Sequence, residues 1–153
     1  MTKLFDLSNI TTYQAAVQQS KAFRELKQLK DSILKPHGLT GSQWTVLGHT
    51  ADAGKAGVRI TALAEQLDTT QAFITNTVNK LAAKGYVERR ADPLDSRVRI
   101  VVIKPKYVPV VAKIEQAVRA ALRREIYSKV TPEELKIYVN VLARFAEKSP
   151  KQN

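Results

Sequence analysis

Residues 71–83, QAFITNTVNKLAA, combine one apolar face with one face that can hydrogen-bond to the edges of bases. Ile74, Val78 and Leu81 recur at steps of four and three, which is the spacing of an amphipathic helix. The opposite face is small or polar and uncharged: Gln71, Ala72, Thr75, Asn76 and Asn79. Amides and hydroxyls can pair with base edges in the DNA major groove. We therefore predict that these five residues contact bases.

A solvated surface helix is the alternative interpretation of this face. Surface helices are usually rich in Glu, Lys and Arg, whereas Asn and Thr are weak helix formers. The segment between Gln71 and Ala83 also contains no acidic residue, as an element that approaches phosphates requires. The pattern favours recognition over solvation. Phe73 has two possible roles: contact with a thymine methyl group, or packing at the end of the neighbouring helix.

A second charged group lies on a predicted β-hairpin, residues 86–103, which we call the wing. Its strands are YVERR and RVRIVVI, and the loop between them is longer and more charged than a hairpin turn requires. In the second strand Val98, Ile100 and Val102 alternate with Arg97, Arg99 and Val101. This alternation predicts that one face of the strand is apolar and that the start of the other face is cationic.

The loop of the wing could be solvated and internally paired, or it could contact DNA. Asp95 and Arg97 are spaced to brace the turn, but an exposed ion pair contributes only about 0 to 1 kcal/mol. An arginine in the minor groove, where the potential is most negative, explains the arginine-rich sequence better. We predict that Arg97 lies in the minor groove and that Asp95 braces the wing.

The chain of 153 residues has a formal net charge of +11, which favours a polyanionic partner. Double-stranded DNA is the first expectation and an anionic membrane surface the second, while a basic protein with solvated lysines is the plain alternative. The residues predicted to contact DNA phosphates lie within or next to the two elements described above: Thr70, Lys80, Lys84, Arg90 and Arg99.

Helical periodicity predicts the elements that position these residues. Residues 9–34 form a long helix that ends before Pro36 and Gly38, and residues 38–52 form a shorter one. A helix of about two turns follows over residues 59–67, with Thr61 as its N-cap. Three or four residues separate it from the helix at 71, which is the helix-turn-helix arrangement, and Gly85 suits the left-handed position after that helix.

Two more helices follow the wing, over residues 108–130 and 131–148. Thr131, Pro132 and Glu134 predict the N-cap, the first helical position and the capping box of the last helix. Its residues predicted to be buried are Leu135, Tyr138, Val139 and Leu142. The apolar stripes of residues 10–33 and 108–145 exceed what one small winged domain could cover, which predicts a homodimer.

The predicted fold is mostly α with a small β-wing, a winged helix-turn-helix with long N- and C-terminal dimerisation helices. Residues 37–104 form the winged helix-turn-helix DNA-binding domain. Residues 1–36 and 105–153 form the helical dimerisation region.

The segments GLTGSQWTVL, ITALAEQL and TVNKLAAKGYVERR, and above all DPLDSR before a β-strand, resemble the multiple antibiotic resistance regulator (MarR) family of bacterial transcription factors. The resemblance covers roughly residues 10–147. It implies a dimeric transcriptional regulator, expected to be a repressor, that binds a pseudo-palindromic operator. Ser96 stands where members often have the first of two arginines, and Asn76 where they often have an arginine in the recognition helix.

The resemblance also implies a small phenolic or other anionic effector, bound between the DNA-binding and dimerisation regions. Tyr13, His37 and Trp44 are candidates to line such a site, and each is also interpretable as a core or helix-end residue. The alternative function is a winged-helix protein that packages DNA or contacts proteins, without a ligand response.

Several other classes are disfavoured by the composition. The chain has no cysteine, so disulfides, thiolate metal sites and thiol redox sensing are excluded. His37 and His49 lie twelve positions apart without a nearby carboxylate pair at metal-ligand spacing, and no glycine-rich phosphate loop is present. We expect that the protein is not an enzyme, and that it has no catalytic residue and binds no metal or cofactor. With no signal-like N-terminus and no long apolar run, we expect a cytoplasmic protein without a membrane partner.

Overall fold

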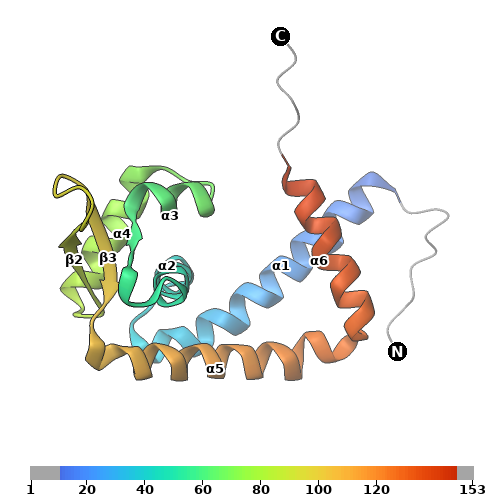
Figure 1. Cartoon of the computed structure of the whole chain (residues 1–153). Helices are drawn as coiled ribbons and strands as arrows, with labels where there is room; N and C mark the ends of the chain where they lie inside the picture. Colours follow the sequence, from blue (N-terminus) through green and yellow to red (C-terminus); the bar gives the residue numbers. More distant parts are fainter. Residues whose placement is uncertain (1–10, 148–153) are drawn as a thin grey trace, which may run out of the picture.

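The computed structural model describes residues 11–147, so the predicted helical residues Asn9 and Ile10 lie outside the described part. The chain is mostly helical, with a small antiparallel sheet, as the sequence predicted (Figure 1). The elements in chain order are α1 (Thr12–Leu34), α2 (Gly41–Asp52), β1 (Val58–Arg59), α3 (Ile60–Gln66), α4 (Gln71–Ala83), β2 (Val87–Ala91), β3 (Arg99–Ile103), α5 (Val108–Glu125) and α6 (Pro132–Ala146). Short 3-10 turns, among them Lys35–His37, join some of them.

Threonine caps set the starts of α1, α2, α4 and α6. Thr131 caps α6, Pro132 takes its first position and the Glu134 side chain completes the capping box, as predicted. Thr40 caps α2 with a capping box that Gln43 completes, and Thr70 caps α4 through its hydroxyl alone. The predicted N-cap at Thr61 is wrong. Helix α3 starts at Ile60 directly from β1, because pairing with β3 keeps the backbone extended through Arg59.

The sheet has the order β1-β3-β2, and β1 was not predicted. Val58 pairs with Val101 on one side of β3, and Arg89 pairs with Val101 on the other. The predicted pattern of β3 is confirmed: Arg99 is exposed at its start, and every residue of Ile100–Ile103 is buried. A central strand is covered on both faces, so its sequence loses the polar alternation of an edge strand.

Gly57, just before β1, makes the third strand possible. Its φ of +72° is left-handed, and an added Cβ would lie 2.6 Å from Cγ1 of Val102 and 2.8 Å from the backbone oxygen of Val101. A larger residue could not bring β1 this close to β3.

The core of the winged domain joins the helix-turn-helix to the sheet. Ile74, Val78 and Leu81 of α4 are all fully buried, which confirms the predicted apolar stripe. Leu63 of α3 and Val101 of β3 belong to the same core cluster. The connection from Gln66 to Gln71 is the short turn that the sequence predicted. Because α4 buries one face here, its other face is directed away from the core.

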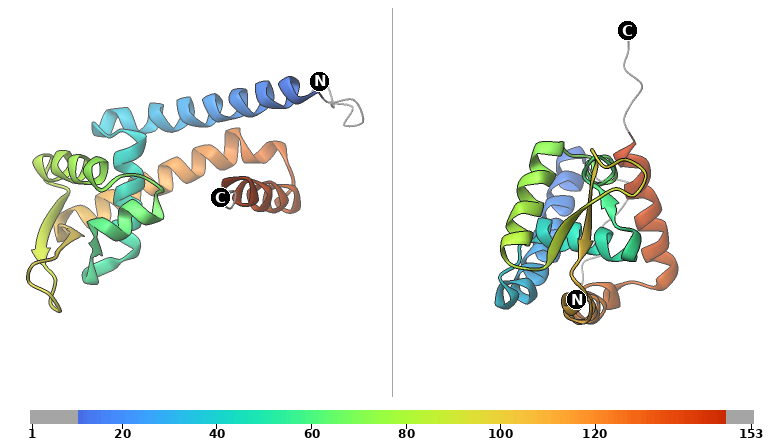
Figure 2. Two further views of the ribbon diagram at one scale, coloured as in Figure 1. Left: turned by 90° about the horizontal axis from the view of Figure 1, so that it is seen from above. Right: turned by 60° about the vertical axis from the view of Figure 1, so that its left-hand side comes forward.

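Helices α1, α5 and α6 extend away from the winged domain (Figures 1 and 2). The predicted burial of four α6 residues is wrong for the single chain: Leu135 and Leu142 are half-buried, and Tyr138 and Val139 are exposed. Helix α6 has no fully buried residue. Its apolar face is open because no other helix of the described chain covers it fully. Within residues 11–147, no helix is long and apolar enough to cross a membrane.

Candidate nucleic-acid interface

The outer face of α4 displays the side chains that the sequence singled out. Gln71, Ala72, Asn76 and Asn79 are exposed, and Thr75 is half-buried. The Thr70 hydroxyl accepts a hydrogen bond from the backbone N–H of Phe73 at 3.1 Å and can still donate its own proton. The Phe73 ring is exposed and so is available at this surface. The base contacts themselves stay predictions.

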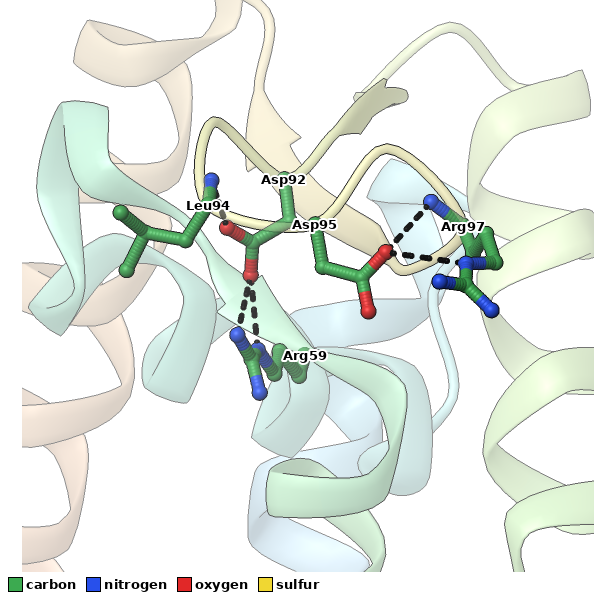
Figure 3. A network of polar contacts seen from close by, with 5 residues as sticks. All are labelled: Arg59, Asp92, Leu94, Asp95 and Arg97. Carbon is green, nitrogen blue, oxygen red and sulfur yellow. Dashed lines mark hydrogen bonds and ion pairs between the residues drawn. The ribbon is translucent and has the colours of Figure 1, made fainter.

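The tip of the wing is held by a carboxylate that sequence reasoning missed. Asp92 Oδ2 accepts a hydrogen bond from Arg59 Nε and forms an ion pair with Nη2, and Asp92 Oδ1 accepts a hydrogen bond from the backbone N–H of Leu94 at 2.8 Å (Figure 3). The backbone N–H of Leu94 and the Arg59 side chain hold the pKa of Asp92 below its usual value. Arg59 and Asp92 are 33 positions apart, so no local pattern identifies the pair.

Arg97 and Asp95 also lie together at this tip. The backbone N–H of Arg97 donates to Asp95 Oδ1 at 3.0 Å, and Arg97 Nε lies 3.7 Å from the same oxygen. The contact predicted from the sequence is therefore present. The Arg97 side chain is nonetheless 94% exposed. Such a loosely held guanidinium can move to a new partner at little cost.

The five predicted phosphate contacts are not equivalent. Lys84 Nζ donates to Gln43 Oε1 at 2.9 Å and to the backbone oxygen of Gly38, so it links the end of α4 to the start of α2. Arg90 Nε donates to Glu88 Oε1 at 2.6 Å. Lys80 and Arg99 are exposed. All five phosphate contacts stay predictions, and for Lys84 and Arg90 they compete with contacts inside the chain.

Arg89 is a second residue that the sequence analysis did not single out. Its Nη2 lies 2.5 Å from Asn79 Oδ1 and 3.5 Å from the backbone oxygen of Thr75. Successive residues of a strand point to opposite faces, so Arg89 shares the face of buried Val87 and points toward α4. Arg90 points to the other face. This alternation is the one sequence signal that could have separated the two arginines.

A cavity of about 750 Å³ lies between α2, the sheet and α5. Trp44, Val102 and Val111 contribute apolar surface, and Arg90 and Arg119 contribute positive charge. The neighbouring Lys30 ammonium lies 5.5 Å from the centre of the Trp44 ring. An apolar cavity with nearby cations can accommodate an aromatic anion.

The structure does not bring the three predicted pocket residues together within one chain. Trp44 lines the cavity, whereas Tyr13 is 72% exposed near the start of α1, the end far from the cavity. His37 is exposed in the 3-10 turn after α1, and its backbone oxygen accepts a hydrogen bond from the Tyr86 hydroxyl at 3.4 Å. The periodicity of the sequence could not show that these residues lie apart. Tyr13 lies near the start of α1, so the length of that helix separates it from Trp44 in α2.

Comparisons with known proteins agree with the fold described above. Residues 37–98 match the sequence profile of the MarR family. A MarR family transcriptional regulator from Streptomyces coelicolor, solved in complex with DNA, is 22% identical over 94% of this chain and 92% of its own, with a TM-score of 0.80. The MepR–DNA complex of S. aureus is 20% identical over 90% of this chain and 97% of its own, with a TM-score of 0.73.

A third structure is CouR from Rhodococcus jostii RHA1, bound to p-coumaroyl-CoA. It is 19% identical over 90% of this chain and 95% of its own, with a TM-score of 0.78. At these identities the three structures establish the shared fold. They support the winged helix-turn-helix with long terminal helices that the sequence predicted.

Proposed function

We propose that the chain is a member of the MarR family, whose profile residues 37–98 match, and that it binds a specific DNA sequence in the cytoplasm and regulates transcription from it. The observation that carries this proposal is the outer face of α4. It exposes Gln71, Asn76 and Asn79 and contains no acidic residue, and the wing beside it exposes Arg97. The polar face of α4 enters the major groove, and the arginine of the wing enters the adjacent minor groove.

The exposed apolar residues of the terminal helices support a homodimer. Tyr13 and Val17 of α1, and Tyr138, Val139 and Phe145 of α6, are all exposed in the single chain. Covering such residues with a second copy removes apolar surface from water, which is the main driving force of association. A twofold dimer presents two α4 helices to two half-sites, so the operator is an inverted repeat. A dimer bound to its operator excludes other proteins from that DNA, which makes repression the simplest outcome.

The cavity beside Trp44 supports release by a small aromatic anion. It lies between the winged domain and α5, which leads to the dimerisation region. A ligand that fits only one arrangement of these two parts shifts the protein toward that arrangement. If that arrangement separates the two α4 helices by the wrong distance, the affinity for the operator falls.

Selection from a random pool of double-stranded DNA tests the function directly. The purified protein should enrich an inverted repeat. Gln71→Ala or Asn76→Ala should weaken binding to that repeat by roughly 1 to 3 kcal/mol per half-site and leave binding to random DNA nearly unchanged. Binding with nearly equal affinity to all sequences would instead favour a DNA-packaging protein. Absence of DNA binding would favour a winged domain that contacts proteins.

A further inference from the structure

In the hydrogen bond between Arg89 of β2 and Asn79 of α4, the chemistry of the two side chains makes Arg89 the donor and Asn79 the acceptor. A guanidinium group carries only donors, so the Asn79 atom 2.5 Å from Arg89 Nη2 must be the carbonyl oxygen Oδ1. The usual ambiguity between the oxygen and the nitrogen of an amide therefore does not apply here. The backbone oxygen of Thr75, 3.5 Å from the same nitrogen, places the guanidinium along the outer face of α4.

This contact restricts what Asn79 can offer to DNA. A free asparagine can accept from N6 of adenine and donate to N7 of the same base, which makes it a common partner of adenine. Here a second donor would have to approach Oδ1 beside a positively charged group. The Asn79 amide nitrogen, in contrast, keeps its donors. The remaining N–H groups of Arg89 are donors as well.

We propose that Arg89 is a specificity-determining residue that fixes the Asn79 amide as a hydrogen-bond donor, so that the pair selects guanine rather than adenine. Guanine is the base that presents two acceptors, O6 and N7, in the major groove. This inference rests on the proposed binding of α4 in the major groove. Arg89 acts through Asn79 and is in this sense a positioning residue supplied by the wing.

Two substitutions separate the roles of the two residues. Asn79→Asp keeps the size of the side chain and an acceptor for Arg89, but it removes the amide donors. A carboxylate can accept a hydrogen bond from N4 of cytosine. In a pool selection with Asn79→Asp, the position of the DNA site whose preference changes toward cytosine is therefore the one that residue 79 contacts. Arg89→Met removes the donors of Arg89 and keeps an unbranched apolar stem.

At that base pair, the wild-type protein should prefer guanine. Arg89→Met should shift the ratio of guanine to adenine toward adenine by roughly fivefold or more, because the freed amide can then contact adenine through both its oxygen and its nitrogen. Arg99→Met is the matched control. Arg99 lies in the paired strand β3, opposite Ala91, and shares the sheet face of Arg89. Its loss should lower affinity for all sequences alike and leave every base preference unchanged.

Three outcomes decide the inference. The expected result is a shift toward adenine in Arg89→Met that is absent in Arg99→Met. The role of Arg89 is overturned if the wild-type protein prefers adenine at the base that residue 79 contacts, or if Arg89→Met leaves the base preference there unchanged. In either case an enriched inverted repeat still supports the proposed function. If the wild-type protein enriches no sequence, both the proposed function and this inference fail. Circular dichroism establishes that each variant is folded.

Discussion

The guanidinium group of Arg59 contacts a single carboxylate oxygen of Asp92 through two of its nitrogens. Nε lies 2.7 Å and Nη2 lies 2.6 Å from Oδ2. The Asp92 side chain is only 8% exposed. The contact therefore joins β1 to the first residue of the loop between the strands of the wing, and the second oxygen of Asp92 orders the loop through Leu94. Charge-assisted bonds of this kind are stronger than neutral ones.

Asp92→Asn should destabilise the protein at neutral pH and flatten its loss of stability in acid. The backbone N–H of Leu94 and the Arg59 side chain lower the pKa of Asp92 in the folded state below its usual 3.8. The carboxylate of Asp92 therefore binds a proton more readily in the unfolded chain than in the folded one. The stability that ionised Asp92 gives the folded state is present above the usual pKa and is lost as the pH falls through the lower folded pKa. Urea denaturation at a series of pH values measures the effect.

Asp95→Asn is the control for this prediction. The Asp95 side chain is 48% exposed, and its ion pair with Arg97 is long, so its loss should change stability much less. Equal stability of wild type and Asp92→Asn at neutral pH would contradict a structural role of the Arg59–Asp92 contact.

Arg97→Lys should reduce the preference for A·T pairs beside each half-site. Lysine keeps the charge, but it is more strongly hydrated than arginine and is a poorer occupant of a narrow groove. Arg97→Ala should abolish this preference and also lower affinity for all sequences. Base frequencies from pool selection measure the preference. If Arg97→Lys keeps both its affinity and the flanking preference, Arg97 is a brace for Asp95 rather than a groove contact.

Val139→Lys should convert a dimer into a monomer. Val139 is 54% exposed in the single chain and lies on the apolar side of α6, so a second copy would bury it. A lysine there would place an unpaired charge in the interface, which is strongly unfavourable. Sedimentation at micromolar concentration should show a dimer for wild type and a monomer for the variant. Asn140→Lys adds the same charge one residue further on, on the polar side, and should remain dimeric. Sedimentation of the wild type as a monomer would refute the dimer.

Binding of an aromatic anion should quench the fluorescence of Trp44, the single tryptophan of the chain. Benzoate is a suitable probe, because the cavity combines apolar walls with Arg119. Arg119→Gln should weaken binding by about 1.5 to 3 kcal/mol, the contribution of a hydrogen bond to a charged group. Arg124→Gln, also on exposed α5 surface but outside the cavity lining, should bind benzoate as wild type does. Equal weakening by both variants would show that only net charge attracts the anion.

The sequence by itself determined the elements whose causes are local. The apolar stripe of Ile74, Val78 and Leu81 fixed which side of α4 is buried, and hence which residues are exposed on its other side. Thr131, Pro132 and Glu134 fixed the start of α6, because capping involves backbone and side chains within one turn. The order of helices and strands then predicted the winged helix-turn-helix.

Only the tertiary structure decided the features that join distant segments. Thr61 looked like an N-cap until β1 was found paired with β3, and the alternation of β3 gave no sign that it is the central strand. The contacts of Asp92 with Arg59 and of Asn79 with Arg89 link residues of different elements. The sequence likewise could not show that the apolar face of α6 is left exposed, because this depends on which other helices of the described chain pack against it. Periodicity reports which face of an element is apolar, but the partner that covers this face is set by packing between segments far apart in the sequence.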